Sequence, residues 1–246
     1  MKHFFFIVLM LACFVSCKKE NDEISITSIN EYSPLVVGKY ITYSLDSLVY
    51  TNFGTQEAHR FYEVKYLITD SILDNLGRKA FRVLRYIRPT SAYPFLPDDT
   101  FMAINTGITF EFIENNYRYI KLVQPIEDDY SWKGNSFIDA TSSNNLNYLE
   151  NWDYTYENVA RKPISPLDTL NFGNNTISVN HIDYSFALPI NISTTYATKD
   201  FSKEVYSKGI GMVYRKFIHF VYQGNITTSI RTYDGYGITL KMIDHN

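Results

Sequence analysis

The chain has 246 residues, of which 45% are hydrophobic and 20% charged, and its formal net charge is −3. This length allows one large or two small domains, with a core that needs no disulfide or metal for stability. The near balance of charges excludes the basic field of a nucleic-acid-binding protein, so we expect no nucleic-acid partner.

The N-terminus is typical of a bacterial lipoprotein signal. An apolar run over residues 4–15 is too short to span a bilayer. Small Ser16 follows it, then Cys17, and the chain becomes polar directly afterwards. We therefore predict a signal peptide over residues 1–16 and a lipid anchor on Cys17, which holds the mature protein at a membrane.

Two features of this region leave alternatives open. Phe14 stands where a lipobox usually has leucine, and Cys13 is a competing lipidation site. A plain secretory signal and an uncleaved anchor are the other interpretations. The sequence has no cysteine after Cys17, which excludes a disulfide framework, thiol catalysis and cysteine-based metal sites in the rest of the chain.

Three segments follow from the composition. Residues 1–16 are the signal peptide, residues 17–33 are the lipidated cysteine with a flexible polar tether, and residues 34–246 are one domain. No repeat and no Gly/Ser or Pro linker divides the last segment.

Within residues 34–246 the apolar residues repeatedly alternate with polar ones, as in Ile41, Tyr43 and Leu45. This period of two is typical of strands with one packed face. Turn residues such as the Asn52-Phe53-Gly54 stretch separate the alternating segments. The predicted strands are 39–50, 58–72, 79–88, 100–104, 107–114, 117–124, 151–157, 167–172, 176–187, 208–222 and 228–243.

These patterns predict an all-β protein. Several of the strands exceed ten residues, which favours a single antiparallel, strongly curved sheet that forms a partial or closed barrel. Lipocalin-like and lipoprotein-carrier-like barrels are the nearest analogies. We expect few helices, with short helical pieces around 134–150 or 198–207.

No established catalytic or cofactor motif is present, and we predict no catalytic residue, no cofactor and no metal site. His59, His181, His219 and His245 have no metal-ligand spacing. We interpret His219 as a partly exposed strand histidine, although a hydrolase that uses His219 or carboxylates is the least favoured alternative. The carboxylates are grouped at residues 98–99 and 127–129, which we interpret as solvated turns.

Two further features allow a structural interpretation. Gly209 and Gly211 precede a strand-like segment rather than a helix, which indicates a bulge or a close backbone approach. The chain is rich in aromatic residues, with 21 Tyr, 17 Phe and 2 Trp. Most of these rings are expected to pack in the sheet's core and edges, and the alternative is a lined cavity or stacking surface for a ligand.

Six stretches, taken in order behind the Cys17 leader, resemble a family of uncharacterised envelope lipoproteins from Bacteroidota. The resemblance covers nearly the whole chain and implies a lipid-anchored protein of the Gram-negative outer membrane, but it carries over no catalytic residue. Acidic residues after Cys17 resemble the surface-export signal of that group, which slightly favours the cell surface over the periplasmic face. The stretches are YSLDS (43–47), GRKAFR (77–82), RYIKL (118–122), SWKGN (131–135), EVYSKGIGMVYR (204–215) and IDH (243–245).

The predicted function is non-catalytic binding. The aromatic strands favour an envelope lipoprotein that binds an apolar or peptide-like ligand, with a glycan less favoured, or a partner envelope protein. The alternative is a structural or assembly accessory of an outer-membrane complex.

Overall fold

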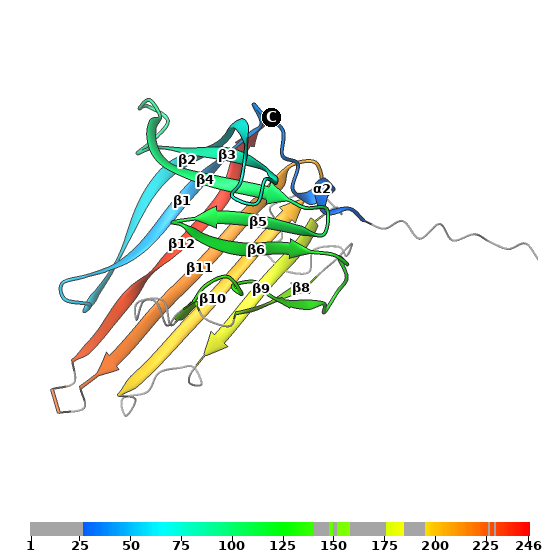
Figure 1. The fold of residues 1–246 in the computed structure, drawn as a ribbon. Coiled ribbons are helices and arrows are strands. Elements are labelled where there is room, and N and C mark those ends of the chain that lie inside the picture. The colour runs from blue at the N-terminus through cyan, green and yellow to red at the C-terminus, as the bar shows by residue number, and fades with distance from the viewer. Residues whose placement is uncertain are drawn as a thin grey trace, which may run out of the picture.

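The structure is a computed structural model that describes residues 27–139, 148–149, 152–157, 176–184, 195–225, 227–228 and 230–246. These residues form one twelve-stranded antiparallel sheet, curved until it is nearly closed into a barrel (Figure 1). The strand order is β6-β5-β4-β3-β2-β1-β12-β11-β10-β9-β8-β7. The predicted all-β class and curved antiparallel sheet are confirmed.

The strands follow the alternating segments of the sequence closely, because each turns one apolar face inward. One short helix, α2, precedes them. The elements are α2 (Ile29–Tyr32), β1 (Tyr40–Thr51), β2 (Gln56–Leu73), β3 (Lys79–Arg88), β4 (Leu96–Asn105), β5 (Thr109–Glu114), β6 (Tyr117–Val123), β7 (Ser131–Lys133), β8 (Asp153–Glu157), β9 (Thr176–Tyr184), β10 (Tyr196–Ser207), β11 (Gly211–Gly224) and β12 (Arg231–His245).

The two edges of the sheet meet through a few hydrogen bonds. The backbone N–H of Ile120 in β6 donates to the carbonyl of Gly134, just after β7, at 2.8 Å. The indole N–H of Trp132 donates back to the carbonyl of Ile120 at 2.8 Å. The hydroxyl of Tyr156 in β8 bridges the backbone N–H and carbonyl of Val123. These contacts satisfy edge groups that a sheet would otherwise expose.

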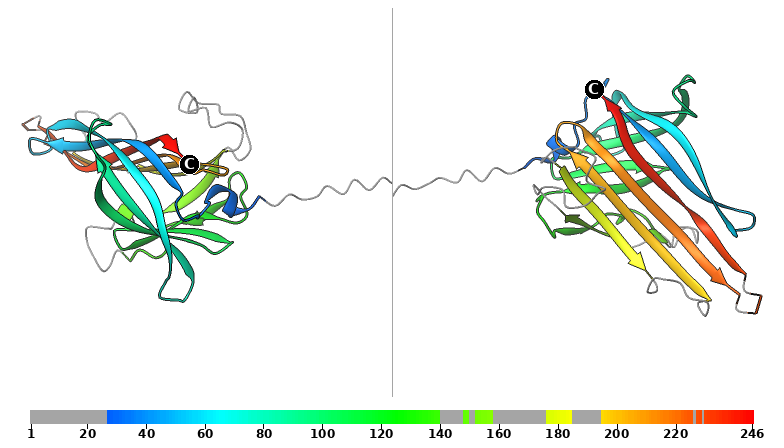
Figure 2. Two further views of the ribbon diagram at one scale, coloured as in Figure 1. Left: turned by 90° about the horizontal axis from the view of Figure 1, so that it is seen from above. Right: turned by 180° about the vertical axis from the view of Figure 1, so that it is seen from behind.

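Strands β1, β2, β11 and β12 are much longer than β5 and β6, and they extend past the barrel as a twisted ribbon (Figure 1). Seen from above, β1–β4 curve round toward β5 and β6, so the sheet encloses a core at one end (Figure 2). Ile29, Tyr32, Phe101, Leu122 and Tyr206 are among the buried residues of this core.

Helix α2 lies at that end of the barrel and belongs to the folded body. A capping box starts it: the Ser28 hydroxyl accepts a backbone N–H, and the Glu31 side chain accepts the N–H of Ser28. The Ile29 and Tyr32 side chains are buried. The tether was predicted to run to residue 33, so the ordered fold begins earlier than expected.

Several predicted boundaries need correction. The stretch 198–207 lies within strand β10 and is not helical, and β7 was not predicted at all. Of the proposed helical stretch 134–150, the described residues form a turn and a single 3₁₀ step at 148–149. Asp98 and Asp99 lie within β4 beside Arg85 and not in a solvated turn. The predicted strand 167–172 lies outside the described residues.

Candidate functional site: a barrel cavity on a buried charged layer

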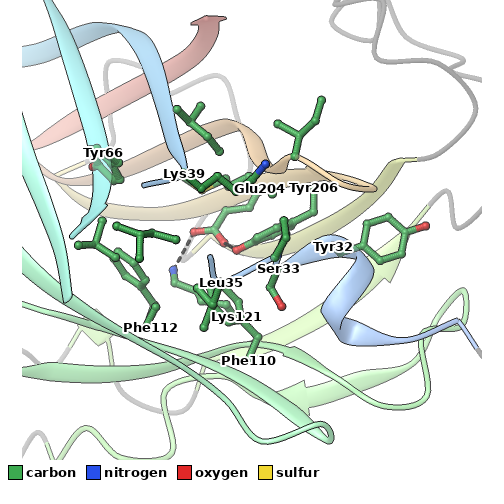
Figure 3. Close-up of a pocket in the computed structure, with 18 of the residues that line it drawn as sticks. Tyr32, Ser33, Leu35, Lys39, Tyr66, Phe110, Phe112, Lys121, Glu204 and Tyr206 are labelled. Atoms are coloured by element: carbon green, nitrogen blue, oxygen red, sulfur yellow. Dashed lines mark hydrogen bonds and ion pairs between the residues drawn. The ribbon is translucent and has the colours of Figure 1, made fainter. Parts of the chain in front are cut away.

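The barrel encloses a cavity of about 100 Å³ between α2 and the strands. Aromatic and aliphatic side chains from α2 through β11 form its walls, among them Tyr32, Leu35, Tyr66, Phe110 and Phe112 (Figure 3). Charged side chains enter it at one place only among the strands, where Lys121, Glu204 and Arg215 line it. We call this space the plug-side cavity.

A β-bulge in β6 allows two consecutive residues, Lys121 and Leu122, to face the interior. Phe110 of β5 pairs with Leu122 of β6, whereas the next residue, Glu111, pairs with Ile120. Lys121 is therefore the extra residue of β6, without a partner opposite it, and its side chain is buried beside buried Leu122. A bulge redirects one side chain without disturbing the rest of the strand.

Glu204 and Arg215 are directly opposite each other on β10 and β11, and both point inward. Glu204 Oε1 accepts from Lys121 Nζ at 2.7 Å, and its Oε2 accepts from the Tyr206 hydroxyl at 2.6 Å (Figure 3). Arg215 Nε lies 3.5 Å from Glu204 Oε1. The consecutive strands β10 and β11, together with the distant strand β6, thus place one carboxylate between two cations.

Glu114, at the end of β5, completes the group. Its Oε2 accepts from Arg215 Nη1 at 2.9 Å. We call Glu114, Lys121, Glu204 and Arg215 the charged layer. It contains two cations and two carboxylates, so its formal charge is zero. Such balance is what allows four ionisable groups to be buried together.

A second cavity of about 80 Å³ lies on the other side of this layer. Lys121 and Arg215 line both cavities, and Glu114 lines only the second. We call this space the tyrosine-lined cavity, because its walls include Tyr117, Tyr119, Tyr148, Tyr154 and Tyr236. The charged layer therefore divides the interior of the barrel into two compartments.

The charges within the layer determine one another's protonation. Burial alone would raise the pKa of Glu204, but the nearby Lys121 and Arg215 charges outweigh it and lower that pKa. The pKa of Glu114 is lowered in the same way, against the effect of its burial, chiefly by Arg215. Arg215 keeps its proton, because the two carboxylates raise its pKa despite burial.

Lys121 differs from the other three groups. Burial lowers its pKa, and the charge of Arg215 acts in the same direction, so the attraction of Glu204 only partly compensates. The Nζ atom also lies 4.9 Å from the Tyr119 ring centroid and 5.9 Å from that of Tyr154. Aromatic faces can hold an ammonium group in this way where water is excluded.

The plug-side cavity is covered by the segment 29–35, which we call the plug. Asn105 in β4 donates from its amide to the Ser33 hydroxyl at 2.8 Å. On the other side, Lys208 Nζ lies 2.8 Å from Glu31 Oε2, and the Gly209 N–H donates to the Glu31 carbonyl at 2.7 Å. Polar contacts thus hold the plug to β4 on one side of this end of the barrel and to the turn between β10 and β11 on the other side.

The turn that holds the plug includes the predicted glycine pair. Gly209 and Gly211 have φ values of 74° and 114°, which favour glycine, and β11 begins at Gly211. The register of β10 and β11 shifts between Val205 and Tyr206, so a bulge lies directly beside this turn. The predicted bulge at a strand start is confirmed.

The structure places His219 and His59, two of the histidines considered from the sequence, in separate hydrogen-bonded groups. His219 lies on β11 with its Nδ1 2.6 Å from Asp200 Oδ1, and the Tyr148 ring stacks on it at a centroid distance of 3.7 Å. His59 lies on the outer face of β2, bonded to Asp46 and Glu57. Within the described ranges, no group of three or more His, Cys, Asp or Glu side chains could hold a metal ion.

Cys17 and the alternative Cys13 lie outside the described residues, so the predicted anchor stays a prediction. Among the residues that the structure covers, no helix is long and apolar enough to cross a membrane. Trp152 is buried and Trp132 packs on Tyr156 at a ring centroid distance of 4.5 Å. Neither indole forms an exposed platform for a sugar.

The charged layer was not predicted, although part of its signal is in the sequence. Arg215 has the same parity as apolar Val213 and Phe217, which places it on the inner face of its strand. Lys121 likewise has the parity of Tyr117 and Tyr119, which line the tyrosine-lined cavity together with it.

A comparison with protein-family models and with curated proteins finds no match to this chain.

Proposed function

We propose that this chain is a lipid-anchored envelope protein that binds a small, mostly apolar ligand in the plug-side cavity. The observation that carries the proposal is a concave, partly enclosed, largely apolar space with a few convergent polar groups at one side, the usual composition of a ligand site. Lys121, Glu204 and Arg215 are those polar groups.

The size of the cavity limits the ligand. Typical ligand pockets measure roughly 300–1,000 Å³, whereas an apolar cavity of roughly 150 Å³ holds benzene. The plug-side cavity, at about 100 Å³, is smaller than that, so without movement of its walls it admits no molecule larger than about a six-membered ring. A longer ligand requires displacement of the plug, which polar contacts at Ser33 and Glu31 hold in place.

Binding is tested on full-length protein purified from membranes in mild detergent. Native mass spectrometry, followed by solvent extraction and analysis of small molecules, should recover a mostly apolar compound at a fixed ratio to the protein. Phe112→Trp, which fills the cavity, should reduce that ratio, and Phe61→Trp on the exposed face of β2 is the matched control. Equal recovery from both variants would argue against the cavity as the site.

The anchor is tested separately. Cells that express the wild-type chain, Cys17→Ala or Cys13→Ala are labelled with radioactive palmitate, and the membrane fraction is isolated. We expect only Cys17→Ala to lose both the label and membrane attachment. Label retained in Cys17→Ala and lost in Cys13→Ala would move the anchor to Cys13.

We place the domain at the outer membrane, on the cell surface, because acidic residues follow the proposed anchor. Protease digestion of intact cells should therefore remove the domain. Protection in intact cells with digestion after outer-membrane permeabilisation would place it on the periplasmic face.

A further inference from the structure

The charged layer has hydrogen-bond donors left over. Arg215 is buried, with only 9% of its surface exposed, and its Nε has no hydrogen-bond partner. The nearest carboxylate oxygen, Glu204 Oε1, lies 3.5 Å away without hydrogen-bond geometry. A buried N–H without an acceptor is costly, so an acceptor in the adjoining cavity would stabilise the structure.

Lys121 adds a second source of donors. Among the described residues its Nζ donates to one oxygen, Glu204 Oε1, although an ammonium group has three N–H bonds. The rings of Tyr119 and Tyr154 lie near Nζ and interact with part of its remaining N–H groups. Lys121 and Arg215 line the tyrosine-lined cavity as well as the plug-side cavity, and only the plug-side cavity also has Glu204, the carboxylate nearest to both donors, in its wall.

Glu204, the one carboxylate of the layer that lines the plug-side cavity, has both of its oxygens occupied. Both oxygens of Glu204 accept a hydrogen bond, one from Lys121 and one from Tyr206. Farther along the cavity wall, the Tyr43 hydroxyl donates to the Met212 carbonyl at 2.7 Å. The floor of the cavity therefore offers donors to a ligand and needs an acceptor from it.

Charge balance decides what kind of acceptor fits. The charged layer is already neutral, so a ligand carboxylate would bring an uncompensated charge into a buried space. Lys39 also lines the cavity, but it is half-exposed at the rim, where water solvates its charge and its Nζ donates to the carbonyls of Gly209 and Asn246. An uncharged oxygen accepts the spare N–H bonds without changing this balance.

We propose that the ligand is a neutral, compact, apolar compound with a carbonyl oxygen, which it presents to Arg215 Nε and Lys121 Nζ. Its hydrocarbon body lies against Phe110, Phe112 and Leu35. This inference rests on the proposed function and adds the chemical class of the ligand to it.

Four probes of matched size test the inference on full-length wild-type protein in detergent, with affinity measured by titration in NMR. They are cyclohexanone, methylcyclohexane, cyclohexanecarboxylate and cyclohexylamine. Because one buried hydrogen bond favours the ketone, we expect it to bind about tenfold more tightly than the hydrocarbon. The two charged probes should bind more weakly than the ketone.

Each other outcome is decisive. Equal affinity for cyclohexanone and methylcyclohexane would overturn the acceptor inference and leave the proposed apolar site intact. Tightest binding of the carboxylate or the amine would overturn the requirement for a neutral ligand. Absence of binding by all four probes would overturn the proposed function itself.

Arg215→Lys provides a variant that keeps the positive charge but removes Nε. We expect its affinity for cyclohexanone to fall about threefold but to stay above that for methylcyclohexane, because Lys121 Nζ can still donate to the ketone. Met212→Leu alters the same cavity at similar volume and is the control. If Arg215→Lys does not fold, the probe comparison on the wild type still decides.

Discussion

The two cavities of the barrel share Lys121 and Arg215, and tyrosines line both, but they differ in the rest of their walls. The plug-side cavity adds mainly aliphatic and phenylalanine side chains, and the plug lies against it. The tyrosine-lined cavity has hydroxyl, amide and carboxylate groups, from Asn115, Ser202 and Glu114 among others. The comparison teaches that the charged layer separates an apolar compartment, suited to a ligand, from a polar one.

A buried charged layer is not by itself evidence that its charges stabilise the fold. Replacing a buried ion-pair network by apolar residues is often neutral or stabilising, whereas removing one member leaves an unpaired buried charge. A layer with surplus donors facing an apolar space is therefore better explained by recognition than by folding. Four sets of substitutions test this difference between the two cavities and the role of the charged layer.

Glu204→Ala should have the largest effect. It leaves the cations Lys121 and Arg215 without the carboxylate between them, so we expect the free energy of unfolding to fall by about 3–5 kcal/mol. Urea denaturation monitored by circular dichroism measures the change. Glu204→Gln with Lys121→Met, which removes one charge of each sign, should lose markedly less. A loss below about 1 kcal/mol for Glu204→Ala would contradict a structural charged layer.

Filling one compartment at a time tests whether only one of them binds ligand. Ala103 is buried in the wall of the plug-side cavity, and Ser202 is buried in the wall of the other. Ala103→Leu should weaken cyclohexanone binding at least about tenfold, and Ser202→Leu should not. Each substitution is expected to cost about 1–3 kcal/mol in stability from overpacking. A stronger effect of Ser202→Leu on binding would assign the ligand to the tyrosine-lined cavity.

The plug should control how fast the ligand exchanges. Asn105→Ala removes the hydrogen bond to Ser33, worth about 1 kcal/mol, which corresponds to about fivefold faster exchange. Line-shape analysis of bound cyclohexanone measures the rate. Thr106→Ala changes the same β4–β5 turn, where Thr106 bonds to Thr109, but leaves the plug contact intact. Equal acceleration by both variants would show that the turn, and not the plug, limits access.

The smallest expected effect is on the acid dependence of stability. The pKa of Glu204 is lowered in the folded state, so its stabilisation is complete above the ordinary value of 4.5 and is lost as the pH falls through the lower folded value. Glu204→Gln should therefore show a flatter loss of stability below pH 4.5 than the wild type. Glu57→Gln, on the outer face of β2, is the control. Identical acid profiles for Glu204→Gln and the wild type would indicate that Glu204 is not ionised in the layer.

Much of the barrel follows from the alternation in the sequence, because most strands turn an apolar face inward. Strand β3, predicted over 79–88, has those bounds. Strand β10 was not predicted, because its inner face carries Asp200, Ser202 and Glu204, which removes the apolar period. The strand whose inner face lacks the apolar alternation is thus the one that supplies Glu204 to the charged layer, as expected for a functional element.

The candidate site was less accessible to sequence reasoning than the fold. The layer joins residues of β5, β6, β10 and β11, and their proximity depends on how far the sheet curves, which no local pattern specifies. Parity directs the side chains of the layer inward, because Glu114 alternates with Phe110 and Phe112, and Lys121 with Tyr117 and Tyr119. Parity does not show that the four side chains meet, and it does not predict that the bulge also turns Leu122 inward.

The most direct test of the central claim is a methyl NMR titration of the full-length protein with cyclohexanone. We expect the methyl signals of Leu35, Ile68 and Val83, which line the plug-side cavity, to shift in a saturable way. The methyl signals of Leu149, which lines the tyrosine-lined cavity, should stay within error. Saturable shifts at Leu149 without shifts at the other three, or no saturable shift anywhere, would contradict it.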